Sequence, residues 1–82
     1  MTGHGSDKSG AAAIRNGRYR HSKGNEYQVI GVARHSESGE QMVVYRCLYG
    51  DRSLWVRPLV MFLENVVVDG WVVPRFTWIS EE

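Results

Sequence analysis

The sequence predicts a small all-β protein, an SH3-like barrel or roll of five to six short strands with one short helical or 3₁₀ turn. Runs rich in β-branched and aromatic residues recur at regular spacing, separated by Gly-, Asn- and Ser-rich turns. The sequence shows no strand–helix–strand pattern. A parallel nucleotide-binding sheet is therefore disfavoured, because such sheets are built from that unit. The 82 residues, 43% hydrophobic and 23% charged, suffice for one small core.

The N-terminal half begins with a segment that has nothing to bury. Residues 1–13 are small and polar, so we expect a disordered tail, followed by a single domain over residues 14–80. Arg18–His21 is the first predicted strand. Glu26–His35 is the second, and Gly31 within it indicates a bulge or bend, because glycine weakens a strand interior.

The third predicted strand, Gln41–Tyr49, has the strongest strand composition in the chain. Its alternation places Val43, Tyr45, Cys47 and Tyr49 on one face. Free cysteine in such an apolar run commonly behaves as a small buried hydrophobe.

The C-terminal half contains a short strand, a helical turn and a hairpin. Leu54–Arg57 is the strand, and Pro58 suits the start of a helical turn that directs Leu59, Phe62 and Leu63 to the core. Asp69-Gly70 between valine-rich arms specifies a type I′ hairpin. The last strand then runs on through residues 75–79, with Pro74 bending it or placing it at an edge.

The triplet Arg-His-Ser occurs twice, at residues 20–22 and 34–36, each time where a predicted strand meets a turn. Serine at a strand end readily bonds nearby backbone groups and starts a turn. We therefore interpret the repeat as turn structure rather than as a working site.

The chain shows no pattern of catalytic or metal-binding residues. His4, His21, His35 and Cys47 lack ligand spacing, and no phosphate-binding glycine loop or nucleophile elbow is present. Nothing in the spacing brings Cys47 to a histidine, as nucleophilic catalysis would need. We predict no enzymatic activity, no metal and no cofactor.

Basic residues concentrate between positions 15 and 35, where five cations face one acid, although the pI is only about 8.0. Alternation places Arg18 and Arg20 on one face of their strand, with Tyr19 and His21 on the other. The candidate ligand surface combines these cations with neighbouring aromatic residues: Arg18, Tyr19, Arg20, His21, Lys23, Trp55 and Arg57.

A domain this small needs most of its aromatic rings inside, so we expect most of Trp55, Phe62, Phe76 and Trp78 in the core. Tyr19 and Trp71 are then the exposed aromatic candidates. Arg57 and Arg75 each adjoin a proline, and each has Glu64 or Asp51 as a candidate partner for a surface ion pair.

These features favour a non-enzymatic module that binds a protein or peptide. The alternative is weak binding of single-stranded DNA or RNA through the basic, aromatic first strand, and a small enzyme is the least favoured class. A single cysteine, no signal-peptide pattern and no apolar run long enough for a membrane span predict a cytoplasmic protein without a membrane partner.

Several segments occur in an order that resembles one known family. They are GRYRHSKGNEYQVIGVARHS, VVYRCLYG, LWVRPLVMFLENV, and the final DG with VPRF. Together they resemble the domain-of-unknown-function family 1653 from about Gly17 to Ile79. The resemblance implies an SH3-like β-roll in a bacterial cytoplasmic protein and supplies no catalytic residues. The chain departs from the family at Ser22, where an aromatic residue is usual, and at Val60, where a polar residue is commoner.

Overall fold

The computed structural model describes residues 14–82, and the predicted tail over residues 1–13 lies outside the described residues. The elements are β1 (Gly17–His21), β2 (Glu26–Arg34), β3 (Gln41–Cys47), β4 (Leu54–Pro58), α2 (Leu59–Phe62), β5 (Asn65–Val68), β6 (Trp71–Pro74) and β7 (Phe76–Ser80). The predicted all-β fold with one short helix is therefore confirmed. Helix α2 has four residues, and no helix within residues 14–82 is long and apolar enough to cross a membrane.

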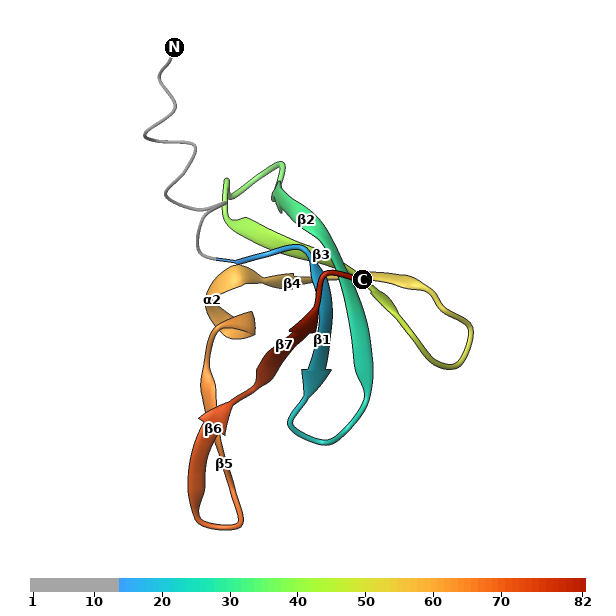
Figure 1. The fold of residues 1–82 in the computed structure, drawn as a ribbon. Helices are drawn as coiled ribbons and strands as arrows, with labels where there is room; N and C mark the ends of the chain where they lie inside the picture. The colour runs from blue at the N-terminus through green and yellow to red at the C-terminus, as the bar shows by residue number, and fades with distance from the viewer. Residues whose placement is uncertain (1–13) are drawn as a thin grey trace.

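The strands form a five-stranded antiparallel sheet of order β4-β3-β2-β1-β7 and a separate two-stranded hairpin, β5–β6. The first four strands meander, and the last strand returns beside the first, as in an SH3-like roll (Figure 1). The hairpin inserted before β7 extends away from the main sheet (Figure 1). This arrangement leaves β4 and β7 as the two edges of the main sheet.

Seven strands form rather than five to six, because the chain breaks where a continuous last strand was expected. Pro74 ends β6, and the Arg75 N–H donates to the Glu64 carbonyl at 2.9 Å, outside the hairpin ladder. The Arg75 carbonyl then accepts from the Ser22 N–H at 2.8 Å. These bonds turn the chain so that β7 pairs with β1 instead of extending the hairpin.

Two glycine-based predictions are confirmed by the backbone geometry. The register between β2 and β3 shifts between Val29 and Gly31, which is the predicted bulge. In the hairpin, Asp69 and Gly70 have φ of 53° and 84°, the left-handed pair that a type I′ turn requires.

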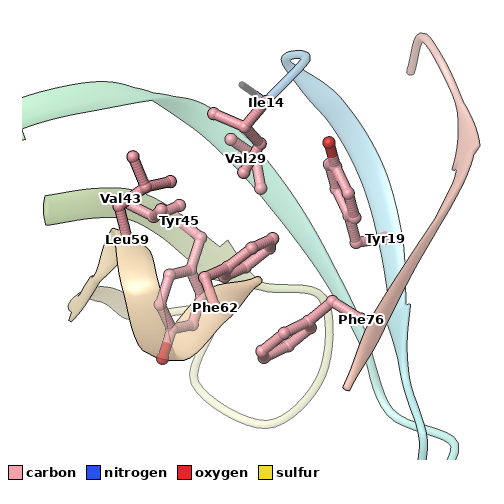
Figure 2. Packing of buried hydrophobic residues seen from close by; sticks show 8 residues of the cluster. All are labelled: Ile14, Tyr19, Val29, Val43, Tyr45, Leu59, Phe62 and Phe76. Carbon is pink, nitrogen blue, oxygen red and sulfur yellow. The ribbon is translucent and has the colours of Figure 1, made fainter. Parts of the chain in front are cut away.

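The hydrophobic core lies between the curved sheet and α2 (Figure 2). Phe62 and Phe76 stack with ring centroids 4.1 Å apart, and Tyr19 packs edge-on against Phe62 at 5.2 Å. The buried side chains are Ile14, Tyr19, Val29, Val43, Tyr45, Cys47, Leu59, Phe62 and Phe76. The prediction for Leu63 is wrong. It is exposed, because α2 ends after one turn and carries only Leu59 and Phe62 inward.

Candidate functional site

A cleft of about 270 Å³ lies on the core-facing side of β2, β3 and β4. The register pairs Tyr27 with Cys47 and Tyr45 with Trp55, so the side chains of each pair emerge on the same face of the sheet. The lining residues come from these strands and the β3–β4 loop: Tyr27, Tyr45, Cys47, Tyr49, Gly50, Asp51, Ser53, Trp55 and Arg57.

Tyrosine rings form one part of the cleft wall. Tyr27 packs edge-on against Tyr45 at 5.3 Å and against Tyr49 at 5.7 Å. The hydroxyls of Tyr27 and Tyr49 are 3.1 Å apart and share a hydrogen bond. This bond, with a further one to Cys47, raises the pKa of Tyr49 above its ordinary value. Tyr49 is therefore uncharged at neutral pH and still offers its hydroxyl group for hydrogen bonding.

Trp55 lies on the other side of the cleft, in a fixed orientation despite its exposure. Its indole Nε1–H donates to the Ser53 hydroxyl oxygen at 2.7 Å, and the Ser53 backbone N–H donates to the Asp51 carboxylate at 3.1 Å. Hydrogen bonds from the Ser53 side chain and then its backbone lower the pKa of Asp51. The carboxylate therefore stays ionised and anchors the Ser53 and Trp55 side chains.

Arg57 supplies a positive charge that has no anionic partner among residues 14–82. It lies opposite Val43 in the strand ladder, and its guanidinium carbon is 5.3 Å from the centroid of the Phe76 ring. Its Nε is buried without a hydrogen-bond partner in the described part of the chain. The anticipated pairing with Asp51 or Glu64 does not form, since Glu64 pairs with Arg75 at 3.1 Å. Arg57 is thus a half-buried cation available to a ligand.

His21 lies next to this region and is held as a neutral ring. Its ring packs edge-on against Phe76 at 4.9 Å, and its Nδ1 accepts the Lys23 N–H at 3.0 Å. Burial, followed by the positive charges of Arg57, Arg75 and Lys23, lowers the pKa of His21. The positive charges of Arg57, Arg75 and Lys23 therefore all act at the His21 ring, and the electrostatic potential there favours an anion.

The two Arg-His-Ser triplets do end strands at turns, but histidine rather than serine makes the bonds. The Nδ1 of His35 accepts the backbone N–H groups of Glu37 at 3.1 Å and Ser38 at 3.3 Å, as the Nδ1 of His21 accepts that of Lys23. The prediction that serine starts these turns is corrected accordingly.

The predicted ligand surface divides into two separate regions. His21, Trp55 and Arg57 gather in or beside the cleft, whereas Arg18 and Arg20 lie on the outer face of β1. Both outer arginines pair with Glu26, at 3.4 Å and 3.0 Å. Lys23 is exposed in the turn after β1.

Tyr19 and Trp55 exchange the positions expected of them. Tyr19 is 7% exposed, and its hydroxyl donates to the Arg15 carbonyl at 2.8 Å, so it belongs to the core. Trp55, expected inside, is 55% exposed. The expectation for Trp71 is confirmed, because it is 73% exposed.

Sequence reasoning missed Tyr27, Tyr49 and the Asp51–Ser53 support of Trp55 as site residues. The recurrence of tyrosine on one face of the segment Gln41–Tyr49 was the available signal, but it was used only to predict a strand. Within residues 14–82, no three His, Cys, Asp or Glu side chains gather as a metal site, and no histidine lines the cleft beside Cys47.

The strand order and the cleft define a class, a small antiparallel β-roll with an aromatic, cation-containing cleft. The chain belongs to the family described as "Protein of unknown function (DUF1653)", which it matches over residues 17–78. It is similar to a solved structure of a protein of this family from Bordetella bronchiseptica, with 34% identity and a TM-score of 0.81. The match covers 88% of this chain and 95% of the other. No curated protein matches the chain.

Proposed function

We propose that this protein is a non-enzymatic binding module that holds a segment of a partner protein in the cleft between Tyr49 and Trp55. The observation that carries the proposal is the unpaired Arg57 guanidinium at a cleft whose exposed tryptophan is already fixed in place. An oriented aromatic ring loses little side-chain entropy when a ligand packs on it. Tryptophan and arginine are also the residue types that contribute most to binding at protein interfaces.

The charges of the cleft suit a peptide better than a nucleic acid. Asp51, held ionised by Ser53, is a cleft-lining carboxylate that repels a phosphate backbone, while Arg57 attracts a single anionic group. The tyrosine rings meet edge-on and are joined through their hydroxyls, so they do not form an open platform for successive bases. The basic strand that favoured nucleic acid has its two arginines paired with Glu26.

An exposed apolar surface supports a protein partner as well. Leu54 and Val56 project from β4 on the side opposite the cleft, and more than half of each side chain is exposed. Contiguous apolar surface of this kind marks interaction sites on small proteins. The free thiol of Cys47 is buried, which supports a role in the reducing cytoplasm.

Selection from a random displayed peptide library tests the proposal. We expect the wild-type protein to enrich a consistent set of peptides, and the Trp55→Ala variant to lose them. Trp71→Ala is the matched control, because Trp71 is an exposed tryptophan on the β5–β6 hairpin and does not line the cleft. Failure to enrich any consistent set, or equal loss in both variants, would overturn the proposal. Salt-sensitive binding of single-stranded oligonucleotides that needs Arg57 would instead favour the nucleic-acid alternative.

A further inference from the structure

The β4 strand has an unpaired backbone edge as well as exposed side chains. Antiparallel ladders alternate bonded and non-bonded residue pairs, and the Cys47 N–H donates to the Ser53 carbonyl at 3.0 Å. Following the register from this pair, Trp55 and Arg57 bond to β3, whereas Leu54 and Val56 point their N–H and C=O groups away from it. No backbone bond from another element within residues 14–82 reaches Leu54 or Val56.

Both faces of this edge are open. Leu54, Trp55 and Val56 are 52%, 55% and 57% exposed, although they are consecutive residues of one strand. A hollow of about 430 Å³, lined by Val44, Leu54, Trp55 and Val56, adjoins the outer face, and the cleft with Arg57 adjoins the inner face. An exposed apolar edge strand with free backbone groups is a template for another strand.

We propose that β4 receives an extended segment of the partner as an added strand, and that this segment alternates apolar and acidic residues. Main-chain hydrogen bonds to Leu54 and Val56 supply affinity, and alternate side chains supply specificity. Side chains on the outer face meet the apolar hollow, and those on the inner face lie opposite Trp55 and Arg57. An acidic side chain there gives Arg57 the anion it lacks. The inference rests on the proposed function and names the ligand class.

Charge complementarity favours a separate acidic segment over a second copy of this chain. The β4 sequence LWVRP contains no acid, so pairing two copies of β4 adds another Arg57 without supplying an anion. Pro58 lacks an N–H and limits how far any added strand can extend.

Fluorescence anisotropy with short labelled peptides tests the inference. The probes alternate valine with glutamate, glutamine or lysine. We expect the glutamate peptide to bind and the lysine peptide to bind at least about tenfold more weakly, as loss of a charge-assisted hydrogen bond implies. Arg57→Gln should remove the preference for glutamate over glutamine. Equal binding of the three peptides would overturn the acidic specificity.

Strand addition itself is tested by Val56→Lys, which should abolish binding of the glutamate peptide. Val67→Lys is the matched control, because Val67 is a 70% exposed strand valine on the β5–β6 hairpin. A second measurement does not depend on protein variants. Alternate nitrogens of the glutamate peptide are N-methylated in two peptides, one with the odd-numbered and one with the even-numbered positions modified. Only the peptide whose modified nitrogens face β4 should lose binding.

The outcomes separate this inference from the proposed function. Peptides that need Trp55 but tolerate Val56→Lys and both patterns of N-methylation would overturn strand addition and leave the proposed function standing. A concentration-dependent dimer of the protein alone, lost in Val56→Lys, would show β4 occupied by a second copy and overturn the inference. Absence of binding by any peptide, including the displayed library, would overturn both proposals.

Discussion

The outer face of β1 and the cleft beside β4 both present arginine, yet the two regions differ in what lies across the strand ladder. Arg20 is directly opposite Glu26, which also accepts Arg18, so two cations share one internal anion. Arg57 is opposite Val43, and no carboxylate among residues 14–82 pairs with it. Strand register therefore decides whether a cation pairs within the fold or remains available to a ligand.

Removing the packing that supports the cleft should have the largest effect. Phe62→Ala takes away the ring stacked on Phe76, which itself lies under His21 and Arg57. Because Phe62 is fully buried, we expect the free energy of unfolding to fall by about 3–5 kcal/mol. Urea denaturation measures it. A loss below about 1 kcal/mol would contradict the assignment of this stack as the centre of the core.

Replacing an arginine by methionine should change the stability of the protein in opposite directions in the two regions. Arg57→Met removes a half-buried charge without a partner and keeps an apolar stem over Phe76, so we expect stability to rise by about 1 kcal/mol while the preference for the glutamate peptide is lost. Arg20→Met breaks an exposed ion pair and should lower stability by at most about 1 kcal/mol. Thermal denaturation of both variants measures the contrast. Destabilisation by Arg57→Met would mean that the guanidinium has an internal role.

Mild acid should lower the stability of the fold through His21. The folded-state pKa of His21 lies below its unfolded value, so the unfolded chain binds the proton more readily. The free energy of unfolding is therefore unaffected by His21 above the pKa of His21 in the unfolded chain, about 6.5. It decreases as the pH falls from that value towards the lower pKa of His21 in the folded protein. Urea midpoints between neutral and mildly acidic pH should therefore fall less steeply in His21→Gln than in the wild type. A slope in His21→Gln as steep as that of the wild type would contradict the role given to His21.

The smallest change in stability is expected when the carboxylate of Glu26, on the outer face of β1, is removed. Glu26→Gln removes the carboxylate shared by Arg18 and Arg20, at a cost of about 0–1 kcal/mol in unfolding free energy. The two freed cations should raise the affinity for single-stranded DNA at low salt, measured by anisotropy. Unchanged DNA affinity would show that Glu26 does not keep this face from phosphate groups.

Local geometry made much of the fold predictable from the sequence. The Asp69-Gly70 turn requires left-handed backbone at both residues, and the Gly31 bulge reflects the low cost of a bend at glycine. Alternation along the third strand predicted that Val43, Tyr45 and Cys47 share one face, and the structure buries all three side chains.

The site was less predictable, because it depends on sheet order and register. Leu54-Trp55-Val56 is apolar on both faces, so alternation could not reveal that β4 lies at an edge with Trp55 exposed. Tyr19 sits between two arginines in sequence, but its strand directs it into the core while both arginines point outward. Likewise, the convergence of His21 and Arg57 near Phe76 joins three strands distant in sequence.

A nuclear magnetic resonance titration of the nitrogen-15-labelled protein with the alternating valine–glutamate peptide tests directly whether Trp55 and Arg57 bind the ligand. The Nε–H of Arg57 and the indole N–H of Trp55 give side-chain signals that report on the two proposed ligand contacts. We expect both signals to shift together as the peptide is added, while the indole signal of Trp71 stays in place. Shifts confined to Arg18, Arg20 or Trp71, with Arg57 and Trp55 unmoved, would contradict this expectation.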